Sequence, residues 1–224
     1  MVSYEHKVKN IYLWEPWWKP GANTLWYYEF TNNLNDSSWN WNDLSQAVSW
    51  FTYNTSWDLT YLTNTTWKIN RQISGVDINN MTVSCWLRKT SSSTRSVIWD
   101  YGMKQGSLSN WKWTWIIVDE NNKIRIFVYN TDITSTLTAS YNNWHHIVLT
   151  NNNGTSTIYL DWTNKRTTTK TFTADSTYFS LLADPYSNAN PHKWDIDSVI
   201  LESKVRTNQE VADYFDQTKI NYWL

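Results

Sequence analysis

Glycine is the most marked shortage in this chain. The 224 residues include 5 glycines, although glycine normally makes up about 7% of a chain, or roughly 16 residues at this length. Tryptophan is correspondingly abundant, with 18 residues. The chain therefore has little of the residue that most readily adopts the left-handed backbone of tight turns.

Other absences exclude whole classes of function. The single cysteine, Cys85, rules out a disulfide framework and lies in the apolar alternation "MTVSCWLR", which predicts a small buried side chain. The formal net charge is -1 and the basic residues are scattered, so nucleic acid is not an expected partner. No hydrophobic run approaches the length of a membrane span, and the N-terminus shows no signal-peptide core.

Short segments rich in Val, Ile, Thr, Tyr and Phe recur between clusters of Asn, Asp, Ser and Thr, a pattern typical of antiparallel strands. The clearest predicted strands are Met81–Arg88, Lys123–Tyr129, Trp144–Thr150, Ser156–Leu160, Thr177–Leu182 and Asp197–Glu202. One short C-terminal helix is predicted over 207–216, because Thr207 and Glu210 form a capping box and apolar residues follow at helical spacing. The fold class is therefore all-β, a sandwich or barrel closed by one helix.

Three segments in order, Met81–Arg88, Asn142–Lys165 and Trp194–Phe215, resemble laminin-G-like jelly rolls of the concanavalin A-like lectin/glucanase superfamily. The resemblance extends from about Thr24 to Asp216 and implies an antiparallel jelly-roll β-sandwich. We expect a domain over 23–224 and an N-terminal extension, 1–22, as an attachment segment. That extension resembles the openings of phage tail and other surface proteins once Trp14 is read as glycine.

Tryptophan stands where the resembling domains usually have glycine. This holds for Trp39, Trp41, Trp162 and Trp194, whereas Trp86 and Trp144 match positions that are aromatic in the family. We hypothesise that the source genome reads the codon UGA as glycine and that many of these tryptophans are misread glycines. Reading 11 to 16 of the 18 as glycine would bring the glycine count to about 16 to 21. The alternative is that the tryptophans are real and form a ligand-binding surface.

Candidate catalytic groups fail on spacing. Asp195 and Asp197 would share a strand face, as the acids of retaining glucanases in this superfamily do, but Ile200 occupies the position of the third acid. His145 and His146 are adjacent and would point to opposite sheet faces, one packed and one solvated. No zinc site, phosphate loop or Ser-His-Asp arrangement can be assembled, so we expect no enzyme and assign no catalytic residue. Calcium, common in laminin-G-like domains, is left open because no ligand set can be chosen.

Two sets of residues are candidates for ligand binding. The loop 181–193 carries an aromatic ring and two amides suited to a hydroxyl-rich ligand, and the strand "WKWTW" would present three indoles on one face if its tryptophans are real. The first set is Tyr186, Asn188 and Asn190, and the second is Trp111, Trp113 and Trp115. These features predict a non-catalytic domain that binds a carbohydrate or another cell-surface ligand, outside the cell or on a virion. The alternatives are a structural jelly-roll module that packs on neighbouring subunits of a virion or surface assembly, and a glycoside hydrolase.

Overall fold

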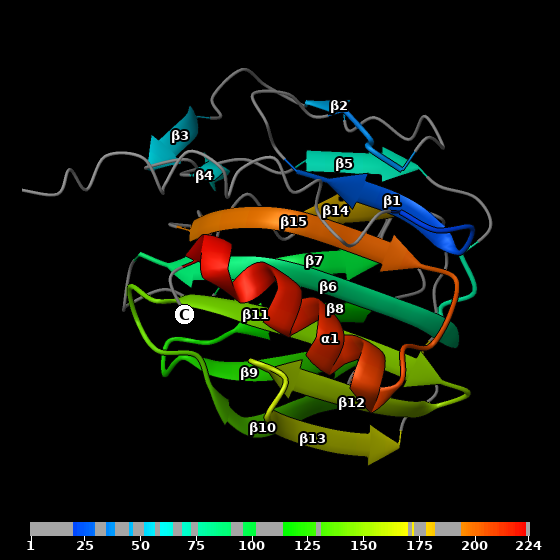
Figure 1. The fold of residues 1–224 in the computed structure, drawn as a ribbon. Coiled ribbons are helices and arrows are strands. Elements are labelled where there is room, and N and C mark those ends of the chain that lie inside the picture. The colour runs from blue at the N-terminus through cyan, green and yellow to red at the C-terminus, as the bar shows by residue number, and fades with distance from the viewer. Residues whose placement is uncertain are drawn as a thin grey trace, which may run out of the picture.

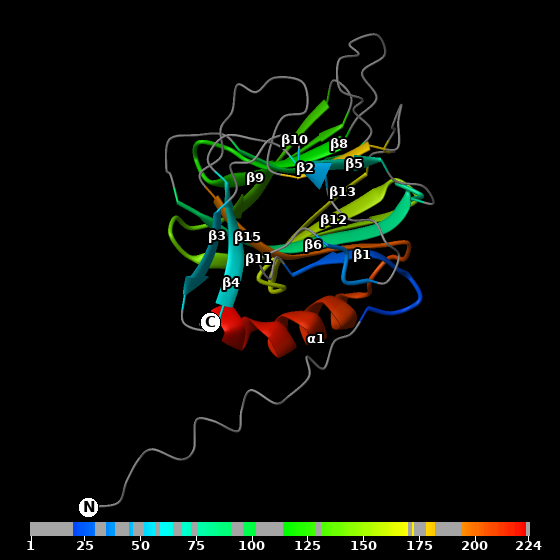
Figure 2. The ribbon, with the colours of Figure 1, turned by 90° about the horizontal axis from the view of Figure 1, so that it is seen from above.

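Two antiparallel sheets face each other in the computed structural model, and one helix lies against the outer face of the larger sheet (Figure 1, Figure 2). The structure describes residues 20–29, 35–38, 45–46, 52–56, 59–64, 69–72, 76–90, 96–101, 114–128, 131–169, 172, 178–181 and 194–222. This arrangement is the predicted jelly-roll sandwich with one C-terminal helix.

The larger sheet has eight strands. In spatial order they are β13 (Asn164–Thr169), β12 (Thr155–Leu160), β11 (Trp144–Asn152), β6 (Asn80–Lys89), β15 (Trp194–Glu202), β4 (Leu59–Asn64) and β3 (Thr52–Ser56), with β1 (Thr24–Tyr28) also paired to β15. Strands from both ends of the chain therefore meet at β15.

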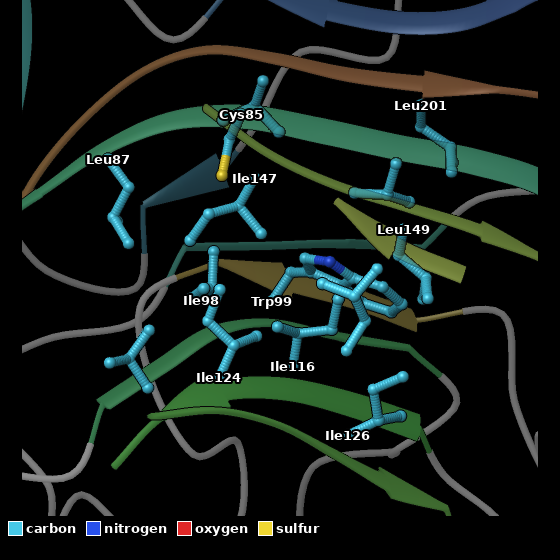
Figure 3. Packing of buried hydrophobic residues seen from close by; sticks show 14 of the residues in the cluster. Cys85, Leu87, Ile98, Trp99, Ile116, Ile124, Ile126, Ile147, Leu149 and Leu201 are labelled. Atoms are coloured by element: carbon cyan, nitrogen blue, oxygen red, sulfur yellow. The ribbon is translucent and has the colours of Figure 1, made fainter. Parts of the chain in front are cut away.

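The smaller sheet has seven strands. Their order is β10 (Thr131–Thr138), β9 (Lys123–Val128), β8 (Thr114–Val118), β7 (Ser96–Tyr101), β14 (Tyr178–Leu181), β5 (Ile69–Gln72) and β2 (Ser45–Gln46). Between the sheets lies one continuous apolar core (Figure 3), whose members include Cys85, Leu87, Ile98, Trp99, Ile116, Ile124, Ile126, Ile147, Leu149 and Leu201. Cys85 is buried as predicted, and burial raises the pKa of its thiol well above the ordinary value.

The C-terminal helix α1 (Asn208–Thr218) begins where the capping box predicts. The Thr207 hydroxyl accepts a hydrogen bond from the Glu210 backbone N–H, and the Glu210 carboxylate accepts one from the Thr207 N–H. Val211, Ala212, Tyr214 and Phe215 are its buried side chains, and a short 3-10 helix, η1 (Lys219–Tyr222), continues the chain. Within the described part of the chain, no helix combines the length and apolar character that a membrane span needs.

The predicted strands match the structure except at β15. The predicted Asp197–Glu202 starts three residues too late, because β15 begins at Trp194 and contains a bulge between Asp197 and Ile200. Ser198 lies in this bulge with left-handed backbone, φ 49°. The bulge shifts the alternation by one residue, so that Ile200 and Asp197 both face α1 and η1 although they are three residues apart.

Candidate functional site

Most residues predicted to bind ligand lie outside the described residues. These are Tyr186, Asn188, Asn190, Trp111 and Trp113. Trp115 belongs to β8, where its backbone pairs with Phe127 of β9 and Asp100 of β7. The indole surface and the polar loop therefore stay predictions.

Both predicted carboxylates of β15 are buried and paired with neighbouring side chains. Asp195 pairs with Arg88, whose Nε lies 2.7 Å from Oδ2. Asp197 accepts hydrogen bonds from the Tyr222 hydroxyl at 2.7 Å and from the Ser198 backbone N–H at 2.7 Å. Because it is fully buried, desolvation raises the pKa of Asp197 to about 7, against the smaller opposing effect of these hydrogen bonds. Both acids occupy the face beneath α1 and η1, as strand alternation predicts, and neither stands in an open site.

His146 is a packing residue beneath the helix. Its ring stacks on Trp86 at 5.1 Å between centroids and lies 5.1 Å from the ring of Tyr214. Among the described residues neither ring nitrogen has a hydrogen-bond partner. Desolvation, followed by the charge of Arg206, lowers the pKa of His146 to about 3, so the ring is neutral at physiological pH.

His145 lies on the opposite side of β11, as predicted, and connects two turns of the sheet. Its Nδ1 is 2.7 Å from Oδ2 of Asp161, and its Nε2 is 2.8 Å from Oγ of Ser140. The Asn143 side-chain amide donates a hydrogen bond to the same Ser140 Oγ at 2.9 Å. We call Ser140, Asn143, His145 and Asp161 the His145 cluster. With its side chain 12% exposed, His145 is not the solvated histidine that the sequence suggested.

No Ser-His-Asp arrangement could be assembled from the sequence, but the structure brings Ser140, His145 and Asp161 together. Ser140 and Asn143 lie in the turn between β10 and β11, and both are exposed. Asp161 opens the turn between β12 and β13, where its backbone N–H donates to the His146 carbonyl and its Oδ1 accepts from the His146 N–H at 2.9 Å. The signal in the sequence was the hairpin centred on 153–154, whose register brings residue 161 against residue 146.

Exposed aromatic side chains flank the cluster on both turns. Tyr141 is 43% exposed, and its hydroxyl donates to the Thr90 carbonyl at 3.0 Å. Trp162 is 38% exposed and follows Asp161 directly. The two turns thus combine aromatic rings, amides, a hydroxyl and an imidazole at one end of the larger sheet. The described residues contain no group of three or more His, Cys, Asp or Glu placed to hold a metal ion.

Asp161 and Trp162 both adopt left-handed backbone, with φ 50° and φ 52°. The β11–β12 hairpin places Asn153 and Gly154 in left-handed backbone, with φ 46° and φ 87°. Aspartate, asparagine and glycine tolerate this conformation, whereas a bulky residue there is an outlier. Trp162 is therefore the strained residue of the β12–β13 turn.

Comparisons with known proteins agree with this architecture. Residues 63–212 match a laminin G family model described as the concanavalin A-like lectin/glucanases superfamily. Domain 4 of AbnA, an extracellular GH43 arabinanase from Geobacillus stearothermophilus solved with arabinotriose, has a TM-score of 0.69 at 17% identity over 86% of this chain and 98% of that one. None of the curated proteins compared with the chain matches it in sequence.

Botulinum neurotoxin binding domains have the same fold. One, from a study of type C cell entry through two ganglioside molecules, has a TM-score of 0.67 at 13% identity over 87% of this chain and 51% of that one. Another, of type DC bound to rat synaptotagmin II, has a TM-score of 0.67 at 13% identity over 88% and 52%. The chain spans about half the length of these toxin chains, and at such identities the likeness shows the fold alone.

Proposed function

Because the chain belongs to the concanavalin A-like lectin/glucanases superfamily, we propose that it binds a carbohydrate or another cell-surface ligand without cleaving glycosidic bonds. The observation that carries this proposal is the pair of turns around the His145 cluster, where Tyr141, whose ring is exposed, follows Ser140 in the same turn as Asn143. Sugars are bound by stacking on aromatic rings and by hydrogen bonds to hydroxyl and amide groups. The arabinotriose and ganglioside studies of similar folds support this ligand class.

Much of the larger sheet is covered on both faces. α1 and η1 cover the part of its outer face where Trp86, Val148 and Ile200 pack against them. Its inner face forms the apolar core. Where α1 and the apolar core cover the sheet, no ligand can reach it, so we expect the ligand at the exposed turns. The loop with Tyr186, Asn188 and Asn190 or the strand with Trp115 would extend the site.

A glycan array tests the proposal. Tyr141→Ala and Asn143→Ala should each weaken binding to any retained glycan about 2- to 10-fold, because each loses one contact worth roughly 0.5 to 1.5 kcal/mol. Asn152→Ala is the matched control, since Asn152 is an exposed amide at the opposite end of β11. Equal binding by all three variants would show that the ligand does not bind at these turns. An array with no competable binding would contradict the proposed binding function itself.

The second candidate is a structural module of a virion or surface assembly. It rests on residues 1–22, which we propose as an attachment segment preceding the domain at 23–224, and on their resemblance to phage tail and surface proteins. Both candidates place the protein outside the cell, on a cell surface or on a virion. Sedimentation of the full chain separates them, because self-assembly without glycan binding favours the structural module. Turnover of a β-glucan would instead support a glycoside hydrolase.

We also propose that residue 162 is glycine in the source organism, as expected where UGA encodes glycine. The left-handed backbone and exposure of Trp162 support this, and so does the contrast with Trp26, Trp86, Trp99 and Trp144, whose side chains are all buried. The mass of the peptide 126–165 from natively produced protein tests it, since that peptide contains Trp144 and Trp162. A mass with both tryptophans would overturn the recoding at position 162, and Trp162 would join Tyr141 as a ring for stacking.

A further inference from the structure

Three side chains of the His145 cluster form a Ser-His-Asp chain of hydrogen bonds, as in a serine acyl-transfer centre. Ser140 Oγ lies 2.8 Å from His145 Nε2, and His145 Nδ1 lies 2.7 Å from Asp161 Oδ2. We propose that Ser140 is a nucleophile toward carboxylic esters, with His145 as its general base and Asp161 as the residue that positions the imidazole. This activity goes beyond ligand binding at the same turns, and it attacks an ester rather than a glycosidic bond.

The hydrogen bonds around Asp161 fix which nitrogen of His145 holds the proton. A carboxylate accepts hydrogen bonds only, so Oδ2 requires the proton on Nδ1 and leaves the lone pair of Nε2 directed at Ser140. Asp161 is itself held, because Oδ1 accepts the His146 backbone N–H at 2.9 Å. The base is thus within hydrogen-bond reach of the nucleophile on one side and of the positioning carboxylate on the other, which is the geometric requirement for activating a hydroxyl.

Asn143 supplies the donor that the reaction needs beside the nucleophile. Its Nδ2 lies 2.9 Å from Ser140 Oγ, so the same amide can bind the carbonyl oxygen that becomes negative when Oγ attacks. A donor placed at developing negative charge stabilises the transition state. Ser140 and Asn143 are exposed on the turn, and an ester can therefore approach directly from solvent.

The proposed reaction balances without any further reactant except water. Ser140 Oγ bonds to the acyl carbon as its proton moves to His145 Nε2, and the ester C–O bond then breaks as Nε2 protonates the departing alkoxide. Water, losing a proton to Nε2, attacks the acyl-serine. The carboxylic acid leaves, and the proton on Nε2 returns to Ser140 Oγ. No atom changes oxidation state.

The substrate class is a carboxylic ester reached from solvent. An acyl group on a sugar hydroxyl is the form that suits the proposed glycan ligand, and the inference rests on the proposed function only for that detail. The cluster excludes little water, so the rate advantage should come from general-base catalysis and lie near the lower end of its usual range, about 100-fold. The competing interpretation is that the His145 cluster only holds the two turns together.

Two measurements on the full chain separate these interpretations. Hydrolysis of p-nitrophenyl acetate and covalent labelling by an alkyl fluorophosphonate should both occur with the parent protein, and the label should be found on Ser140. Ser140→Ala should abolish the label and lower the hydrolysis rate about 100-fold. Ser203→Ala is the control, because Ser203 is an exposed serine outside the cluster.

The His145→Gln variant tests the role of His145 as general base. It is assayed with and without added imidazole. Rate and label should fall with the variant, and imidazole should restore part of the rate if the fold is intact by circular dichroism. A parent protein that hydrolyses the ester no faster than Ser140→Ala, or that carries no label on Ser140, would overturn the proposal. Since p-nitrophenyl acetate contains no sugar, this outcome is independent of the glycan array.

Discussion

Trp162 allows a direct test of whether the β12–β13 turn requires left-handed backbone at position 162. Its φ of 52° places a bulky side chain in left-handed backbone, which costs roughly 1 to 2 kcal/mol for a residue with a Cβ. Glycine carries no such cost, but it loses about 0.5 to 1 kcal/mol through its greater freedom in the unfolded chain. Comparing Trp162→Gly with Trp162→Ala isolates this difference, because both variants lose the same indole. We expect the glycine variant to be the more stable of the two by about 1 kcal/mol.

Lys165 provides the matched control. It is exposed and lies three residues further along in β13, in extended backbone. At this position the stability difference between the glycine and alanine variants should have the opposite sign. Lys165→Gly should be less stable than Lys165→Ala by about 0.5 to 1 kcal/mol. Urea unfolding measures both pairs, and the comparison is valid where the dependence of the unfolding free energy on denaturant is unchanged. An alanine variant at position 162 as stable as the glycine variant would refute the reasoning, because the turn would then not demand left-handed backbone.

Three further predictions concern the face beneath α1. Burial raises the pKa of Asp197 to about 7 from an ordinary value of 3.8, so the folded state binds this proton more tightly and Asp197 makes stability fall as pH rises between about 4 and 7. Asp197→Asn should remove that fall, which urea midpoints across this range will show relative to the parent. The pKa of His146 is lowered to about 3 from 6.5, so it makes stability fall as pH drops below about 6.5, and His146→Phe should remove this opposite slope in the same titration. Trp86→Ala should cost about 3 to 5 kcal/mol in the unfolding free energy, because the buried indole stacks on Phe215 and on Tyr222 at 4.0 Å; a loss below about 1 kcal/mol would mean that the helix does not depend on this contact.

The parts of the fold that the sequence predicted were those controlled by short-range chemistry. Alternation identified β6 and β11, and the capping box of Thr207 and Glu210 located the start of α1. The β15 bulge escaped because Ser198 has no residue-type signal for left-handed backbone, and only the pairing with β6 reveals the shift. Register is a property of two strands, so one strand read alone misses it.

The candidate site was predicted less well for the same reason. Ser140 and His145 lie close in the chain, but Asp161 reaches His145 only through the pairing of β11 with β12. His145 was expected to be solvated because alternation gives the face of a residue and not what a neighbouring turn places over it. The ligand residues proposed from composition, Tyr186 among them, depend on loops rather than on strand periodicity.

The position of α1 explains why the proposed binding and chemistry gather at one end of the larger sheet (Figure 2). Val211, Tyr214 and Phe215 pack on its outer face, and the apolar core fills its inner face. Neither face can therefore present polar groups in the region that these residues cover, where burying an unpaired polar group would cost a few kcal/mol. The turn that carries Ser140 and the turn that carries Asp161 escape this constraint, because each lies beyond the end of a strand. The side chain of His145 links the two turns through its hydrogen bonds to Ser140 and Asp161, and a substitution at His145 should therefore alter the site before it alters the sandwich.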